Sequence, residues 1–274
     1  MTSEREYFIV IHLLKSELFR MRRRLQSLIM ILIAAVLVGL FYGGFTVGAL
    51  VANAKNVNDF KRELPFDRLS NFGLQFGAFF GSIILVVMAS GLIGNEFSWN
   101  TIRPLLARSR SRATLLTAKF LTLLIYVVIF CFVLAVLTGV FSLIGSKIAG
   151  VDTAFSTNAL VEAFWYTWRI VLVNLPTVAL AFMLALVARS NAAGIGVALG
   201  VTFLAPILFA ILGNLSGIFV KVEKGGLSYN TNKILMDGIH NSGQWVALAV
   251  MLAYTAIFVA ISYFVFLRRD VTSG

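Results

Sequence analysis

Charged side chains are scarce in this sequence, at 13% of 274 residues, whereas soluble domains carry about 25%. Hydrophobic residues make up 59%, and the mean hydropathy is +0.90. A water-soluble chain of this length must cover its surface with polar groups, so a surplus of this size excludes a soluble globular domain. The composition predicts a protein whose solvent is the lipid bilayer.

Cysteine and histidine are nearly absent. The single cysteine, Cys131, excludes an intrachain disulfide and any metal site built from several cysteines. The two histidines, His12 and His240, fall on opposite sides of the membrane in the topology derived below, so they cannot share a metal ion. The sequence also lacks His-Glu-x-x-His, Gly-x-Ser-x-Gly and the phosphate-binding Gly-x-x-x-x-Gly-Lys-Ser/Thr pattern. We therefore expect no enzyme activity and no cofactor bound by this chain.

Long apolar runs are what the sequence has in abundance. A helix needs about 20 apolar residues to cross roughly 30 Å of hydrocarbon. Six runs are long enough: 25–50, 71–95, 118–145, 160–188, 191–215 and 244–267. The longest polar stretches between them, 52–70 and 216–243, are too short for an independent soluble core. The predicted fold is an all-α integral membrane protein with six transmembrane helices in a single domain over 1–274.

Lysine and arginine are distributed unevenly about these spans. Fourteen of the 23 lie on the side of the N-terminus and eight on the other, with Arg169 at the far end of the fourth span. Because cytoplasmic loops carry the excess of positive charge, both termini and residue 108 are expected in the cytoplasm, and residues 60 and 230 outside. The predicted location is the plasma (inner) membrane. Deep acidic residues are lacking in the spans, which disfavours proton- or sodium-coupled transport.

The segment before the first span, residues 3–24, is predicted to be an amphipathic helix at the cytoplasmic interface. Ser3 and Glu6 form a capping box at its start. Its apolar side chains recur at helical spacing, at Tyr7, Ile11, Leu14 and Leu18. The alternative is a positively charged flank of the first span that forms no separate helix.

Glycines recur at intervals of four in the spans. Gly73, Gly77 and Gly81 share one face of the second span, and the first span carries similar pairs at Gly39/Gly43 and Gly44/Gly48. Small residues at this spacing let helix backbones approach closely. Such a face serves a subunit interface, a pathway wall or ordinary packing within the bundle. Pro206 lies inside the fifth span, where it is expected to kink the helix.

The loop between the second and third spans is short, basic and partly apolar. Ile102, Leu105 and Leu106 lie at helical spacing among arginines that include Arg103 and Arg108. A simple connector needs no such apolar set, whereas a docking surface does. The alternative is a helix that lies on the lipid headgroups.

This loop resembles the hallmark of the permeases of type-two ABC exporters. That hallmark is a glutamate, a threonine, an apolar pair, Ser-Arg, Leu-Leu and a lysine that opens the third span. The matching residues are Glu96, Thr101, Leu105-Leu106, Ser111-Arg112, Leu115-Leu116 and Lys119. The family often has glycine where Asn100 stands, and Pro104 interrupts the segment. The six-span layout, the N-terminal helix and the short C-terminal tail also resemble this family, so the likeness covers essentially the whole chain.

The resemblance implies a permease subunit that pairs with a second permease, identical or related, and binds separate nucleotide-binding ATPase subunits. Those partners would hold ATP and Mg, and no nucleic acid is involved. Coupling to the ATPase would use Glu96, Thr101, Arg103, Leu105, Leu106 and Arg108, with residues 3–24 as a connecting helix beside it. Substrate would move outward from the cytoplasm or inner leaflet. The alternatives are a secondary transporter, a channel or a membrane scaffold that transports nothing.

Overall fold

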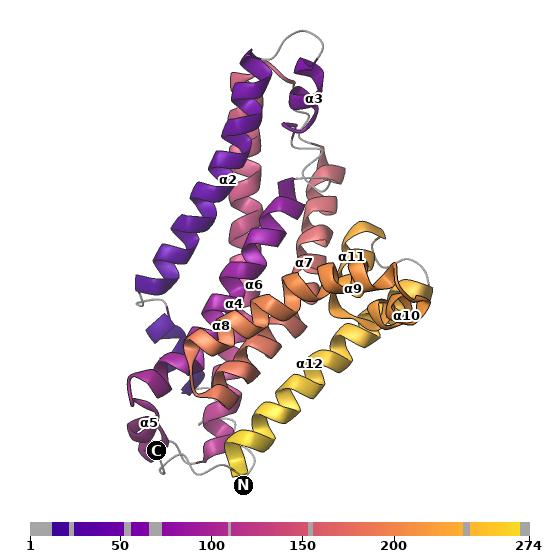
Figure 1. The fold of residues 1–274 in the computed structure, drawn as a ribbon. Helices are drawn as coiled ribbons and strands as arrows, with labels where there is room; N and C mark the ends of the chain where they lie inside the picture. The colour runs from indigo at the N-terminus through magenta and orange to yellow at the C-terminus, as the bar shows by residue number, and fades with distance from the viewer. Residues whose placement is uncertain are drawn as a thin grey trace. The chain divides into compact units, whose positions relative to one another are not determined.

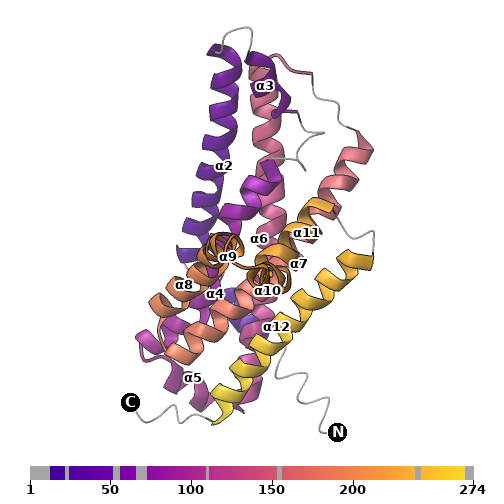
Figure 2. The same ribbon diagram turned by 45° about the vertical axis from the view of Figure 1, so that its right-hand side comes forward.

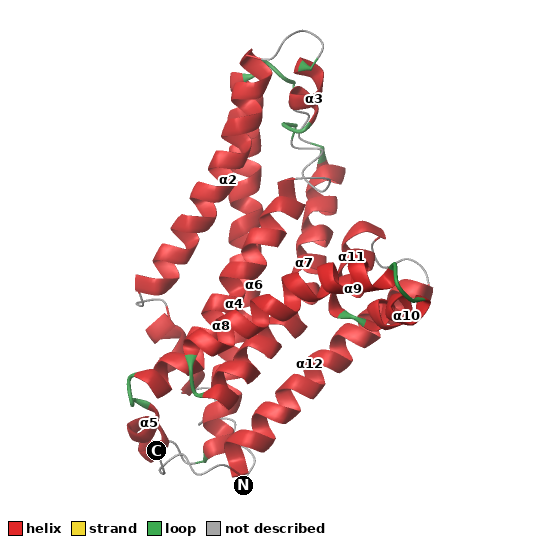
Figure 3. Cartoon of the chain, viewed as in Figure 1, coloured by secondary structure: helices red, strands yellow, loops and turns green. Residues whose placement is uncertain are grey.

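The structure, a computed structural model, describes residues 13–21, 25–51, 56–65, 73–108, 111–152, 156–237 and 242–268. These residues form helices joined by turns and contain no strand (Figure 3). Six helical runs are long and apolar enough to cross a membrane: α2 (Leu25–Val51), α4 (Gly73–Ser98), α6 (Arg112–Ile148), α7 (Thr157–Ala188), Asn191–Gly213 and α12 (Ser242–Arg268). The all-α fold with six spans is therefore confirmed.

In the part of the chain that the structure describes, four shorter helices lie between the spans (Figure 1). They are α3 (Val57–Arg62), α5 (Ile102–Arg108), α10 (Gly217–Gly225) and α11 (Leu227–Asp237). Residues 13–21 are also helical. Leu14 and Leu18 of the predicted connecting helix are half-buried there, whereas Tyr7 and Ile11 lie outside the described residues. An interfacial position for this helix stays a prediction.

The chain divides into two compact units. The first, here the α2–α3 unit, comprises Leu25–Ile84 and Val128–Val171. The second, here the α8–α12 unit, comprises Met1–Arg24, Leu85–Val127 and Leu172–Gly274. The boundaries fall inside α4, α6 and α7, so each of these helices contributes residues to both units. This division into units does not test the single permease domain expected over 1–274, which stays a prediction.

Glycines bring the helices of the α2–α3 unit together. A Cβ atom at Gly73 would overlap the hydroxyl of Tyr42 on α2. At Gly77 and Gly81 it would lie 3.3 and 3.1 Å from Cδ2 of Leu134 on α6. The face formed by Gly73, Gly77 and Gly81 is thus occupied by α2 and α6 of this same chain. The contacts of these three glycines are therefore those of helix packing within the bundle.

Helix α2 is buried along one stripe only. Its buried residues follow each other at intervals of three, four or seven: Ser27, Ala34, Val38, Tyr42, Thr46 and Ala49. The short helix α3 covers one end of this stripe, where Phe60 fills the space beside Gly48 and meets Phe45 at a ring-centroid distance of 6.0 Å. The remaining surface of α2 is apolar and exposed, as expected for a helix that faces lipid or a partner.

The fifth span is interrupted, as Pro206 predicts. It consists of α8 (Asn191–Leu199), a π-helical turn η2 (Gly200–Leu204) and α9 (Ala205–Gly213), with Pro206 in the first turn of α9. Proline has no N–H to donate to the carbonyl four residues earlier, which is that of Thr202. The hydroxyl of Ser228 on α11 donates to this carbonyl at 3.5 Å. A side chain from a neighbouring helix thereby offsets the lost backbone bond.

The stretch 216–243, expected to be a polar loop, contains two helices. α11 packs on α12 and on the middle of α7 through a core of Val173, Ile234, Ala247 and Met251 (Figures 1 and 2). Tyr254 of α12 donates a hydrogen bond to the carbonyl of Gly225 at the end of α10, at 3.2 Å. The segment is too short for an independent core, but it buries its apolar faces against a span.

Candidate functional site

The candidate site is the loop between α4 and α6, in the α8–α12 unit. Helix α4 ends in a Schellman motif: Thr101 N–H donates to the carbonyl of Glu96 at 2.9 Å, and Asn100 N–H donates to that of Phe97 at 3.2 Å. Asn100 has a φ of 54°, in the left-handed region that only glycine and asparagine adopt readily. The motif explains why asparagine can replace the glycine that the family often has there.

Helix α5 begins immediately after this turn. Pro104 is its third residue, and a proline in the first turn of a helix costs little because the N–H it lacks has no intrahelical partner there. Pro104 therefore starts the helix and does not break it. Ile102 is buried, while Leu105 and Leu106 are half-buried. Arg103 and Arg108 belong to the same short helix.

Helix α6 begins at Arg112, six residues before the predicted third span. Ser111 caps it: Thr114 N–H donates to the Ser111 hydroxyl at 3.1 Å, and the two side-chain oxygens lie 2.6 Å apart. Leu115 and Leu116 are fully buried in the next turn. The Ser-Arg and Leu-Leu pairs of the family pattern thus supply a helix cap and a buried anchor.

A buried ion network lies at the base of the loop. Lys119 is 0% exposed, and its Nζ lies 2.5 Å from Oε1 of Glu96 and 3.4 Å from Oε2 of Glu17. Glu17 also accepts from Arg20 at 3.0 Å. The two carboxylates are 1–2% exposed. Buried charges are tolerated only when they are paired, so this arrangement holds three segments together: residues 13–21, the end of α4 and the start of α6.

The start of α6 is also tied to α12. The hydroxyl groups of Thr117 and Tyr263 lie 2.6 Å apart in a hydrogen bond. On the opposite side of the loop, a Cβ atom at Gly94 would come within 2.7 Å of the Asn191 backbone, so α4 and the start of α8 are in direct contact. The loop is therefore anchored to the ends of several spans.

All but one of the predicted coupling residues lie close together in the chain, on or beside α5; the exception is Glu96. Thr101, Arg103, Leu105, Leu106 and Arg108 all lie on α5 or at its start. Glu96, which was expected among the contact residues, is buried inside the unit and paired with Lys119. It can affect a partner only by positioning the loop.

Sequence reasoning missed two features of this site. Trp99 follows α4 directly and is 63% exposed, which is unusual for so large an apolar side chain at the edge of a basic loop. Glu17, a charged residue of the predicted amphipathic helix, is buried against Lys119. The tryptophan was visible in the sequence beside the loop; the contact of Glu17 was not. Among the described residues there is no group of three or more His, Cys, Asp or Glu side chains that could hold a metal ion.

Comparison with known proteins places these features in a family. The sequence profile of the ABC-2 family of transporter proteins matches residues 13–205, a range that includes helical residues 13–21, the loop, four spans and part of the fifth. The chain is also similar to the uncharacterized protein YhcI of Bacillus subtilis (strain 168), with 25% identity over 224 residues, or 74% of this chain and 67% of the relative. With its six membrane-spanning helices, this multi-pass, non-enzymatic permease chain belongs to the ABC-2 family of transporter proteins.

Proposed function

We propose that this chain is the membrane-spanning subunit of an ATP-driven exporter and that α5 docks it to a separate nucleotide-binding ATPase subunit. ATP and Mg would bind to that partner. The chain would lie in the inner membrane with both termini in the cytoplasm, and it would form the substrate pathway together with a second permease subunit. Membership in the ABC-2 family supports the general assignment.

The observation that carries the proposal is the chemistry of α5 and its flanks. Leu105 and Leu106 are half-buried and Trp99 is largely exposed, while Arg103 and Arg108 belong to the same short helix. Protein contacts draw their affinity from a few apolar anchors, tryptophan prominent among them, and their register from surrounding charges. These features suit a groove on a soluble partner.

The buried ion network supports a mechanical role for the loop. Through Lys119 it joins the helix of residues 13–21 and the end of α4 to the start of α6. A partner that moves α5 would therefore move these segments as one body. ATP binding could then bias the permease between two discrete packings, as an alternating-access exporter needs.

The exposed spans support pairing with a second permease subunit. Within this chain, 6% of an 18-residue apolar stretch of the fifth span is buried, and 17% of such a stretch of the first. A Cβ atom at Gly43, Gly44, Gly196 or Gly200 would meet no atom of the described residues within 4 Å. Small residues on an open helix face permit close approach by another helix, identical or related.

Copurification tests the proposal. Changing Leu105 and Leu106 together to Asp puts two charges where the contact needs apolar groups. Docking should weaken by about 2–5 kcal/mol, or roughly 30-fold or more in affinity. The variant should insert normally but lose its ATPase partner. Leu267→Asp, at an exposed leucine near the end of α12, is the matched control and should retain it.

A secondary transporter, a channel or a scaffold makes a different prediction. None of these needs an ATPase subunit, so the parental chain would copurify with none. The double Asp variant would then behave as the parental chain does.

A further inference from the structure

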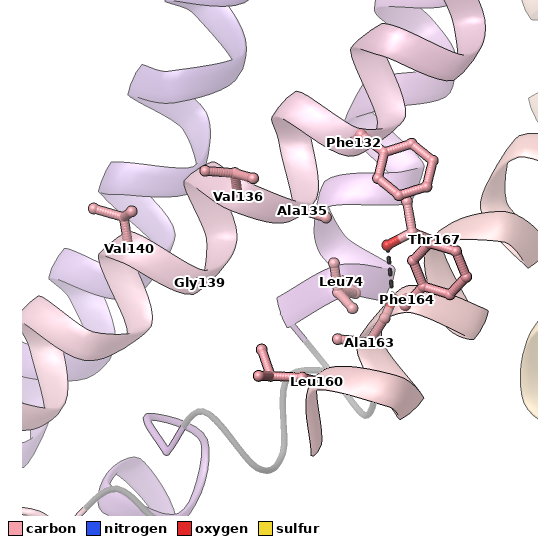
Figure 4. A pocket seen from close by; sticks show the side chains of 10 residues that line it. All are labelled: Leu74, Phe132, Ala135, Val136, Gly139, Val140, Leu160, Ala163, Phe164 and Thr167. Carbon is pink, nitrogen blue, oxygen red and sulfur yellow. Dashed lines mark hydrogen bonds between the residues drawn. The ribbon is translucent and has the colours of Figure 1, made fainter. Parts of the chain in front are cut away.

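A groove of about 360 Å³ opens between α6 and α7 within the α2–α3 unit (Figure 4). Helix α6 supplies one wall with Phe132, Val136 and Val140, and α7 supplies the other with Leu160 and Phe164. Most of these wall residues are well exposed, Val136 to 65%. The groove is therefore open to whatever surrounds the helices, and its volume lies at the lower end of the range for ligand sites, about 300–1,000 Å³.

The lining of the groove is apolar. Leu74 of α4 is fully buried and also lines it, and Ala135 and Gly139 leave room between the larger residues of α6. Thr167 is the one polar side chain among the described lining residues. Its hydroxyl donates to the carbonyl of Ala163 at 2.7 Å, so it needs no partner in the groove (Figure 4). A ligand with polar groups along its length would find nothing to bond there.

A lysine lies beyond one end of the groove. Lys147 follows Val140 by seven residues, which puts it on the same face of α6 and about 10 Å further along the helix. Its side chain is exposed. Glu162 and Arg169 are the charged residues of α7 nearest in sequence to its groove-lining residues. They occupy the helix face opposite to Leu160 and Phe164. Asp152 lies beyond the end of α6.

We propose that the groove holds one acyl chain of an anionic phospholipid, with the lipid phosphate beside Lys147. A single hydrocarbon chain suits an apolar groove of about 360 Å³, whereas a helix of a second copy, about 10–12 Å across, is too large for that volume. A chain that leaves the bilayer gains no hydrophobic energy, because lipid tails are as apolar as the groove. The contacts with the groove walls and the Lys147–phosphate pair therefore retain it.

Trp168 offers a reporter beside the groove, because its ring lies 5.6 Å from that of Phe132. The full chain would carry the changes Trp99→Phe, Trp165→Phe and Trp245→Phe, so that Trp168 is its only tryptophan. It would be placed in nanodiscs of phosphatidylcholine that contain a low mole fraction of phosphatidylglycerol with brominated acyl chains, which quench tryptophan fluorescence. The brominated phosphatidylglycerol should quench Trp168 more than brominated phosphatidylcholine does at the same mole fraction. We expect about two- to fivefold higher relative affinity, as one exposed ion pair provides.

Two variants separate the parts of the proposal. Lys147→Gln should abolish the preference for the anionic lipid and leave the fold intact, since the side chain is exposed. Ala135→Leu should fill the groove and lower the quenching by both lipids. Ala256→Leu, at an exposed alanine of α12, adds the same atoms elsewhere and should change nothing. Equal quenching by the two lipids at every mole fraction overturns the proposal, as does quenching that neither Lys147→Gln nor Ala135→Leu alters. Quenching below the bulk level with both lipids indicates a protein occupant and also overturns it.

Discussion

Removing the ammonium group of Lys119 should destabilise the protein more than any other single charge deletion in the loop region. The change Lys119→Met keeps a similar apolar stem but leaves Glu96 and Glu17 as buried carboxylates. Breaking a buried ion pair by deleting one partner costs about 3–5 kcal/mol. Glu17 keeps Arg20 at 3.0 Å, so most of the loss falls on Glu96, whose oxygen lies 2.5 Å from the lysine.

The geometry also predicts an order among related variants. Glu96→Gln should cost less than Lys119→Met, because the lysine keeps Glu17 at 3.4 Å. Glu17→Gln should cost least, since its contact with Lys119 is the longer one. The double variant Lys119→Met/Glu96→Gln should lose less free energy of unfolding than the two single variants lose in sum, because it removes both charges of the pair. The coupling expected is about 0.5–3 kcal/mol.

Reversible unfolding in mixed micelles measures these free energies. Lys15→Met is the control, since Lys15 is an exposed lysine in the same N-terminal helix and its loss should be nearly neutral. The reasoning fails if Lys119→Met is as stable as Lys15→Met. It also fails if the effects of Lys119→Met and Glu96→Gln simply add.

Three further predictions follow from the backbone, the packing and the charge distribution. Asn100→Val should lower the melting temperature by forcing a β-branched residue to a φ of 54°, at a cost of about 1–2 kcal/mol, while Asn100→Gly should be neutral; equal melting of both would contradict the assigned turn. Gly77→Leu should destabilise the fold because a Cβ there would lie 3.3 Å from Leu134, whereas Gly225→Leu, at the exposed last residue of α10, should leave the melting temperature unchanged; similar melting temperatures for both would mean that the glycine face is not packed. In a chain with Cys131 replaced, single cysteines at the outer positions Arg62 and Lys221 should react with an impermeant thiol reagent in intact cells, whereas one at the inner position Ser111 should not. Labelling at Ser111 alone would invert the topology.

Hydropathy was sufficient to predict the six spans, because crossing the bilayer demands long apolar helices whatever their partners. It set their limits less well. Helix α6 starts at Arg112 because Ser111 caps it, and its first turns extend past the apolar run. Hydropathy does not predict the helices of segment 216–243, because they are short and partly polar. They are stabilised by packing against α12, which no local pattern reveals.

The candidate site was predicted in part. The family pattern led to Thr101, Leu105 and Leu106, and spacing alone predicted that α5 is a helix. The pairing of Glu96 with Lys119 could not be derived from a single sequence, and the contact with Glu17 joins residues far apart in the chain. Buried ion pairs depend on tertiary approach, and charged residues at span ends are ordinarily exposed.

The central claim is that α5 contacts an ATPase subunit, and site-specific photocrosslinking in cells tests it most directly. A photoreactive benzoylphenylalanine at position 105 should join the chain to a protein whose sequence contains the Gly-x-x-x-x-Gly-Lys-Ser/Thr nucleotide-binding pattern, as identified by mass spectrometry. The same group in place of Trp245, an exposed residue near the start of α12, should give no such adduct. Adducts at position 105 with lipid alone, or with a protein that lacks the pattern, would contradict the account.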